Sequence, residues 1–281
     1  FMKKWILTKN SADYESFSRE LNIDKVCVKC MMNRGVDSLE KMKEFLSDEL
    51  TDSFEYAGLP EIGKAVECIR DAKDKGINCR VIGDYDADGV CSATILVKGL
   101  SFYGISCDYA IPNRLTDGYG INESLVTKAH EDGIGLIVTC DNGISAKSAI
   151  DKAKEYGMTV VVTDHHSVTE EVFPDSADAC VNPRMNSNSY PFPDICGALV
   201  AFKLLCALFE SDSRFDEIKE ELLEFAAIAT VTDVMPLKSE NRRLVKWVLK
   251  RLHNPLNKGL LSLVKETKVS EKSTNVTCSD I

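Results

Sequence analysis

Short apolar runs alternate with longer amphipathic stretches through the middle of this chain. Each run is short enough to be a buried strand, and the stretches between the runs have the length and periodicity of helices. Alternation of this kind predicts a parallel sheet whose strands are joined by right-handed helical crossovers. We therefore expect an α/β fold with a five-stranded, mainly parallel sheet flanked by helices. The expected strands are 79–83, 107–111, 135–140, 159–163 and 179–181, and the helices between them lie near 89–103, 122–132 and 145–156.

Helical patterns dominate both flanks of this region. Ser11 is placed to cap a helix running through Leu21, and Ser38 to cap a second one. Pro60 stands where the first turn of a helix closing at Gly76 is expected. After a polar loop at 165–195, helices are expected at 197–210, 215–230, 241–252 and 258–267, with a polar tail from 270. This organisation predicts a helical lead-in at 1–76, an α/β domain at 77–253, and a helical connector and tail at 254–281.

Composition places the chain among ordinary globular proteins. Its 281 residues are 44% hydrophobic and 28% charged, and no apolar run approaches the ~20 residues of a membrane span. The N-terminal residues lack the apolar core of a signal peptide. The eleven cysteines lie mostly within apolar segments, which is typical of buried free thiols in a reducing compartment. We expect a cytoplasmic monomer without membrane attachment.

Two further features limit the possible partners. Cys27 and Cys30 have metal-ligand spacing, but no second pair follows and the chain has only four histidines, so we expect them to pack within a helix. The net charge of −10 argues against a nonspecific nucleic-acid coat. A net negative charge is still compatible with a local basic groove beside an acidic metal centre.

The stretch Arg80–Val97, RVIGDYDADGVCSATILV, carries the densest candidate chemistry. Asp84, Asp86 and Asp88 alternate directly after the first expected strand, so an extended backbone would bring them to one face. Three converging carboxylates repel one another unless a cation lies between them, and such oxygen ligands suit Mg²⁺ or Mn²⁺. Taken alone, the same residues also fit a solvated acidic loop.

Acids and histidines follow two more of the expected strands. Asp141 follows the strand at 135–140, and Asp164, His165 and His166 follow the strand at 159–163. The carboxyl ends of parallel strands meet at one edge of a sheet, where ligands of α/β folds bind. A shared metal site is therefore the better interpretation, and so many acids suit two cations about 3.5–4 Å apart acting in phosphoryl displacement. Asp233, after the apolar stretch 225–231, is a further candidate ligand that periodicity alone does not identify.

Four ordered motifs resemble those of the DHH phosphoesterase superfamily. They read DYDADG at 84–89, CDNGIS at 140–145, TDHH at 163–166 and TVTDVMPL at 230–237. Within the superfamily the chain is similar to the exonucleases specific for single-stranded DNA, over most of residues 35–260. The additional stretches that carry this likeness are IPNRLTDGYG at 111–120, NPR at 182–184, YPFPDICGALVAFKLL at 190–205 and NPLNKGL at 254–260.

The resemblance implies specific roles for the motif residues. It implies that two divalent cations, Mn²⁺ or Mg²⁺, are held by Asp84, Asp86, Asp88, Asp141, His165 and Asp233, with Asp141 bridging them. It implies that Asp164 and His166 orient the ligands or contact the scissile phosphate, and that Asp141, Asp164, His165 and His166 form the catalytic group. Asp84 stands where relatives that act on small substrates usually carry histidine, which favours the exonuclease branch.

Two departures from the family pattern matter. Leu199 stands where the family usually has glycine, at a helix start close to the substrate. Family members are also about twice as long, because a second catalytic lobe and a nucleic-acid-binding OB-fold follow. We therefore interpret the chain as an N-terminal portion or as an unusually short relative. Single-strand-binding protein and helicase partners are further implications of the resemblance.

Residues outside the motifs have two possible roles each. Arg114 and Arg184 follow strands on the active edge, where their guanidinium groups suit phosphate oxygens or pair with the ligand carboxylates. Tyr119 is placed either to stack a base or to pack within its loop. We expect His130 and His253 to be surface residues.

The leading hypothesis is a metal-dependent phosphodiesterase that releases mononucleotides from single-stranded DNA, with 5′-to-3′ polarity implied by the resemblance alone. One alternative is a hydrolase of short oligonucleotides or cyclic dinucleotides. Another, of a different class, is an inactive replication or repair scaffold, which would have lost metal ligands that this chain retains.

Overall fold

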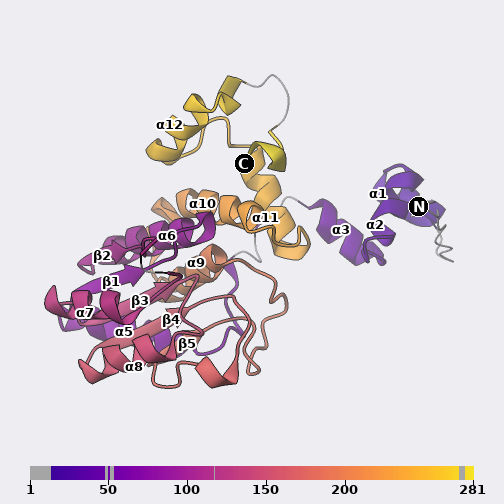
Figure 1. Ribbon diagram of the computed structural model, residues 1–281. Helices are drawn as coiled ribbons and strands as arrows, with labels where there is room; N and C mark the ends of the chain where they lie inside the picture. The colour runs from indigo at the N-terminus through magenta and orange to yellow at the C-terminus, as the bar shows by residue number, and fades with distance from the viewer. Residues whose placement is uncertain (1–13, 48–49, 51–53, 117, 272–275) are drawn as a thin grey trace, which may run out of the picture. The chain divides into compact units, whose positions relative to one another are not determined.

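The computed structural model describes residues 14–47, 50, 54–116, 118–271 and 276–281 (Figure 1). The chain divides into two compact units, Phe1–Glu49 and Leu50–Ile281. The expected cap at Ser11 lies outside the described residues, as does part of the expected polar tail. None of the helices in the described ranges is long and apolar enough to cross a membrane.

Three short helices form the described part of the smaller unit, α1 (Tyr14–Leu21), α2 (Lys25–Met32) and α3 (Leu39–Leu46). Ser38 caps α3 by accepting a hydrogen bond from the Lys41 amide, as the sequence predicted. The buried face of α2 consists of Val28, Met31 and Met32. Cys27 and Cys30 lie in the same helix but are exposed, so our expectation that they pack was wrong. The apolar residues of α2 occupy the other face and leave both thiols outside the core.

The larger unit contains the predicted five-stranded sheet, and all its strands are parallel. The order across the sheet is β2-β1-β3-β4-β5, so strands are added on one side of β1 and then on the other, and the switch point of this order lies between β1 and β3. A reversal of this kind opens a crevice at the carboxyl ends of the strands. The strands are β1 (Cys79–Ile82), β2 (Cys107–Ala110), β3 (Leu136–Cys140), β4 (Thr159–Thr163) and β5 (Ala179–Val181).

Helices cover both faces of the sheet, because its central strands are apolar on both faces (Figure 1). One face, which includes Val81, Val138 and Val161, packs against α5 (Ile62–Asp74), α6 (Ala87–Tyr103) and α9 (Gly197–Leu208). The other face, which includes Ile137 and Val162, packs against α7 (Glu123–Glu131) and α8 (Lys147–Glu155).

The helices after the sheet begin close to the predicted positions. They are α10 (Lys219–Thr232), which packs on α6 and α9, then α11 (Ser239–Leu249) and α12 (Lys258–Glu266). Short 3₁₀ turns occupy Glu170–Val172, Ser213–Glu217, Val269–Glu271 and Cys278–Asp280. The predicted helix at 215–230 therefore starts later, because its first residues form a 3₁₀ turn. Pro60 lies two residues before the start of α5 rather than in its first turn, and Glu61 at the cap has φ of +52°.

A buried ion pair joins α9 to α11 behind the sheet. Lys203 Nζ lies 2.8 Å from Glu240 Oε2, and both side chains are almost completely inaccessible. Lys203 also donates to the carbonyl of Glu55, and the Tyr190 hydroxyl donates to Glu240. This network fixes the start of α11 and therefore the path of the loop that precedes it.

Candidate metal centre

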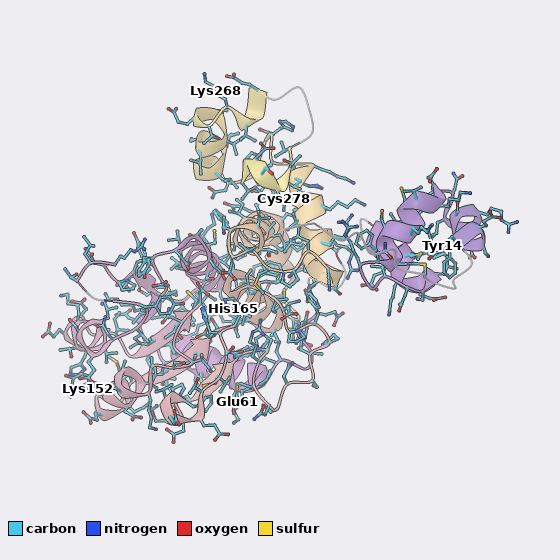
Figure 2. The ribbon with its side chains drawn as sticks, turned by 45° about the vertical axis from the view of Figure 1, so that its right-hand side comes forward. Tyr14, Glu61, Lys152, His165, Lys268 and Cys278 are labelled. Carbon is cyan, nitrogen blue, oxygen red and sulfur yellow. The ribbon has the colours of Figure 1, made fainter. Side chains whose placement is uncertain are left out.

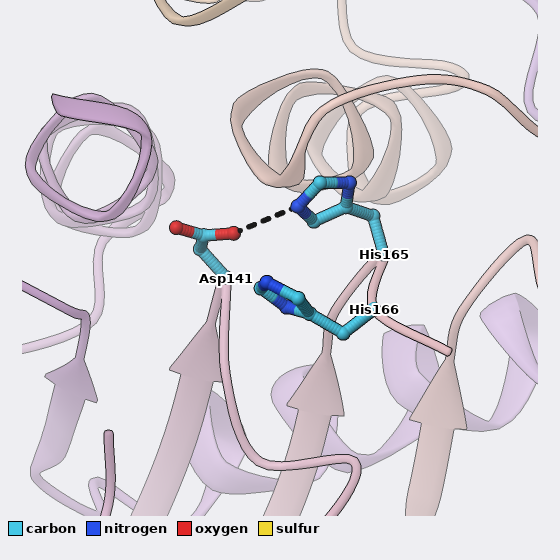
Figure 3. A group of neighbouring side chains, drawn as sticks. All are labelled: Asp141, His165 and His166. Carbon is cyan, nitrogen blue, oxygen red and sulfur yellow. Dashed lines mark ion pairs between the residues drawn. The ribbon is translucent and has the colours of Figure 1, made fainter. Parts of the chain in front are cut away.

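The loops after β1, β3 and β4 and the end of α10 bring acidic and histidine side chains together at the carboxyl edge of the sheet. Figure 3 shows Asp141, His165 and His166 above the tips of parallel strands. His165, which is labelled in Figure 2, belongs to the larger unit and is only 6% exposed. Its Nε2 atom is 3.1 Å from Asp141 Oδ1, 3.6 Å from Asp88 Oδ2 and 3.7 Å from Asp233 Oδ2. Three carboxylates therefore surround one imidazole nitrogen.

The acids of the first motif divide between the loop and the start of α6. Asp84 is buried and accepts a hydrogen bond from the Gly120 amide, while Asp86 caps α6 through the Gly89 amide. A Cβ atom at Gly89 would lie 2.5 Å from the Asp84 carbonyl oxygen, so this turn requires glycine. Burial raises the pKa of Asp84, and repulsion from Asp86 adds to the increase. The expected alternation thus gives way to a helix start, and Asp88 lies in its first turn.

Asp88 has a second role that the sequence did not indicate. Its two carboxylate oxygens accept hydrogen bonds from the amides of Gly197 (2.7 Å) and Ala198 (2.8 Å) at the start of α9. Cys196, at the N-cap of α9, makes no side-chain capping bond. Asp88 therefore caps α9 from another helix, and its Oδ2 still faces His165. Burial raises the pKa of Asp88.

Asp141 occupies the centre of the cluster with a left-handed backbone. Its φ is +60°, a conformation that aspartate tolerates better than most residues. The side chain is buried, and a Cβ atom at Gly197 would lie 2.7 Å from Asp141 Oδ1, so α9 approaches as closely as glycine allows. Burial raises the pKa of Asp141 well above its ordinary value, and repulsion from Asp88 and neighbouring acids raises it further.

Asp164 and His166 form a pair beside the cluster. Asp164 Oδ1 lies 2.7 Å from His166 Nδ1, and the carboxylate also accepts amide hydrogen bonds from Ile144, His165 and His166. Burial alone would raise the pKa of Asp164, but these hydrogen bonds and the nearby imidazole lower it. The hydrogen bond to Asp164 raises the pKa of His166. Asp164 thus orients the ring of His166, which remains 46% exposed on the open side.

The donor set fits divalent cations. Buried atoms without a hydrogen-bond partner among the described residues include Asp84 Oδ2, Asp141 Oδ1 and both ring nitrogens of His165. Two groups of potential ligands share His165: one adds Asp141 and His166, and the other adds Asp88 and Asp233. Buried carboxylates that lack hydrogen bonds and raise one another's pKa are stabilised when a cation binds. Asp233 joins the cluster because α10 ends at Thr232, one residue before it.

The two arginines expected near this centre have different environments. Arg114 is exposed and stacks over the ring of Tyr85, 5.5 Å from its centroid. Arg184 donates from Nε to the carbonyl of His165 and pairs with Asp194. The carboxylate that pairs with Arg184 is therefore Asp194 rather than one of the candidate ligands.

The remaining expected residues are not part of the cluster, with one exception. His130 is exposed and stacks on Tyr156, whereas His253 is half-buried. Leu199, the departure from the family pattern, is completely buried in the hydrophobic core. Tyr119 is the exception, because its hydroxyl reaches both Asp141 and His166.

Two asparagines that we did not single out hold the site together. Asn142 is buried, donates to the carbonyls of Ile82 and Cys140, and accepts from the Ile121 amide. It therefore fastens β1, β3 and the 118–121 loop to one another. Asn182 donates to the carbonyl of His166. In the sequence Asn142 precedes a glycine after a strand, and that signal indicates only a turn.

Comparison with known proteins agrees with the motifs. Residues 78–230 match the model of the DHH family, N-terminal domain. The single-stranded-DNA-specific exonuclease RecJ of Bacillus subtilis is 35% identical over 93% of this chain and 32% of its own length. RecJ of Escherichia coli is 36% identical over 76% of this chain and 38% of its own length. The chain thus spans about a third of the length of these curated relatives.

Solved structures show the same relationship. A crystal structure of exonuclease RecJ bound to manganese has a TM-score of 0.67 and 34% identity, and covers 76% of this chain and 54% of its own. RecJ from Thermus thermophilus in complex with Mn²⁺ has a TM-score of 0.74 and 28% identity, and covers 92% of this chain and 36% of its own. These findings confirm the resemblance seen in the motifs. This chain belongs to the DHH family and is homologous to the N-terminal part of the exonuclease RecJ.

Proposed function

We propose that this chain is the catalytic N-terminal lobe of a metal-dependent exonuclease that removes mononucleotides from single-stranded DNA. The observation that carries the proposal is the arrangement of three carboxylates around His165 Nε2 at the carboxyl edge of the sheet. Relatives that share this fold are named as single-stranded-DNA exonucleases, and their structures contain manganese or magnesium. The proposed catalytic domain is 77–253, and 5′-to-3′ polarity is part of the proposal.

Two cations, Mn²⁺ or Mg²⁺, would be held by Asp141 together with the acidic and histidine side chains around it. Bound divalent cations supply positive charge that stabilises the attacking and leaving oxygens of a phosphodiester displacement. Asp141 is close to both groups of potential ligands, since its Oδ1 lies 3.1 Å from the shared His165 and Asp88 and Asp233 of the second group repel its carboxylate. The proposed ligands are Asp84, Asp86, Asp88, Asp141, His165 and Asp233.

Three further side chains, those of His166, Arg184 and Arg114, would contact the scissile phosphate. His166 is held at Nδ1 by Asp164, and its side chain is 46% exposed on the open side, where the ring would contact a phosphate oxygen. Arg184 is fixed to the backbone of His165. Burial raises the pKa of Asp233, and the nearby charge of Arg184 offsets part of that increase, so its guanidinium group borders the cluster. Arg114, stacked on Tyr85, is the third proposed phosphate contact.

Hydrolysis of a labelled single strand tests this proposal directly. The chain, with Mn²⁺, should release mononucleotides from a long single-stranded oligonucleotide faster than it cleaves a dinucleotide. Excess chelator should stop the reaction, and Asp141→Asn should abolish it while retaining the fold. Undiminished turnover in chelator, or by the variant, would refute the metal-dependent mechanism. Preferred cleavage of the dinucleotide would instead identify a small-substrate hydrolase.

A further inference from the structure

A tyrosine on a glycine-flanked loop reaches the ligand cluster from outside the four motifs. Tyr119 lies between Gly118 and Gly120, which have φ of +79° and +66°, values that glycine adopts without strain. The Gly120 amide donates to Asp84. A Cβ atom at Gly120 would lie only 3.0 Å from Cβ of the buried Asn142, so the loop packs closely against it. These contacts fix the position from which Tyr119 extends.

The hydroxyl of Tyr119 makes two contacts with the cluster. It lies 3.0 Å from the carbonyl oxygen of Asp141 and 3.3 Å from Nε2 of His166. A carbonyl oxygen only accepts hydrogen bonds, so the hydroxyl proton is donated to Asp141 and its lone pairs face His166. The ring is also edge-on to the rings of His166 and Tyr85. One side chain therefore contacts residues from the loops after β1, β3 and β4.

Both contacts restrain groups whose orientation matters. Asp141 has a left-handed backbone, and the direction of its carboxylate depends on that backbone. A hydrogen bond to its carbonyl hinders rotation of the following peptide. His166 is held by Asp164 at Nδ1, and Tyr119 adds a contact at the opposite nitrogen.

We infer that Tyr119 is a positioning residue whose hydroxyl orients Asp141 toward the cations and His166 toward the phosphate. The inference rests on the proposed metal-dependent hydrolysis. Outer groups that orient ligands commonly change metal affinity or activity by 10–100-fold when removed, which is a general expectation for such contacts.

The competing role for Tyr119 is base stacking, because the residue is 51% exposed. The two roles depend on different parts of the side chain. Positioning requires the hydroxyl, whereas stacking requires only the ring. Tyr119→Phe removes the first and keeps the second, and Tyr119→Leu removes both. Tyr109→Phe is the matched control, since Tyr109 lies on the edge strand β2 and is 66% exposed.

The test measures Mn²⁺ affinity by calorimetry and the kcat and KM for a single-stranded oligonucleotide, with thermal melting as a check of folding. Tyr119→Phe should lower both Mn²⁺ affinity and kcat about tenfold and leave KM unchanged. Tyr109→Phe should match the parent. Parental Mn²⁺ affinity and kcat in Tyr119→Phe would overturn the inference, and a raised KM in Tyr119→Leu alone would assign Tyr119 to stacking.

The two readouts separate this inference from the proposed function. If the parent does not hydrolyse DNA, the proposed function fails, but the difference in Mn²⁺ affinity still decides the role of Tyr119. If the parent hydrolyses DNA and Tyr119→Phe is indistinguishable from it in both readouts, only the role of Tyr119 is rejected.

Discussion

Replacing Asp88 and Asp141 separately by asparagine should change the stability of the metal-free protein in different ways. Both are buried acids of the same cluster, and both substitutions preserve side-chain size. Their hydrogen bonds differ. Asp88 accepts two backbone amides of α9 and the Ser92 hydroxyl, whereas Asp141 Oδ1 has no hydrogen-bond partner among the described residues.

The expected magnitude follows from these contacts. In Asp88→Asn an amide donor replaces one acceptor, so one buried backbone N–H at the start of α9 loses its partner and the charge of the cap is removed. The unsatisfied N–H group and the lost charge-assisted hydrogen bond together should lower the free energy of unfolding by about 2–4 kcal/mol. At ~2–4 °C per kcal/mol for a domain of this size, Tm should fall by about 5–15 °C. Asp141→Asn removes a charge that its neighbours repel, and asparagine tolerates the left-handed backbone, so Tm should stay the same or rise.

The assay is thermal unfolding followed by circular dichroism in excess EDTA, repeated with Mn²⁺. In EDTA, Asp88→Asn should melt below the parent and Asp141→Asn should not. Mn²⁺ should raise the Tm of the parent, because a ligand that binds only the folded state stabilises it, and should raise that of Asp141→Asn much less. Equal melting of Asp88→Asn and the parent in EDTA, or a lower Tm for Asp141→Asn than for Asp88→Asn, would contradict the assigned contacts.

Three further predictions concern the pH dependence of the acid cluster, the close approach of Gly197 to Asp141, and the buried ion pair of Lys203 with Glu240. Burial and mutual repulsion raise the pKa values of Asp141 and Asp88, so above the ordinary carboxyl pKa of ~3.9 the folded metal-free protein binds more protons than the unfolded chain. Its free energy of unfolding, measured with urea in EDTA, should therefore fall as pH rises from 5 to 8. Mn²⁺-dependent activity should instead rise over pH 6–8, because the acids and His165 must lose protons to bind the cation. A metal-free protein that gains stability with pH would contradict this. Gly197→Ala should weaken Mn²⁺ binding in calorimetry, because the new Cβ would lie 2.7 Å from the Asp141 carboxylate, and parental affinity would show that the cluster can shift. Lys203→Met leaves Glu240 buried without its cation and should lower the free energy of unfolding by about 3–5 kcal/mol, most of which Lys203→Met with Glu240→Gln should restore; an unchanged urea midpoint for the single variant would refute the importance of the pair.

The sequence by itself determined the sheet and the edge at which the candidate metal ligands meet. Apolar runs of strand length separated by helical stretches leave few topologies, and the right-handed crossover places all carboxyl ends at one edge. Asp141 and His165 each follow such a strand directly, so local order was enough to predict that they approach one another. The family motifs extended this to Asp233, for which local periodicity had no signal.

Only the tertiary structure decided how the candidate ligands are held in place. The amides that Asp88 caps lie more than a hundred residues along the chain, and the contact exists because Gly99 and Gly197 let α9 approach α6 and the β3 loop closely. Asn142 and Tyr119 are similar cases, since neither residue type predicts a particular partner. Hydrogen bonds between distant segments depend on where helices cross and loops close, and those positions are set by packing of the whole core rather than by the residues that form the bonds.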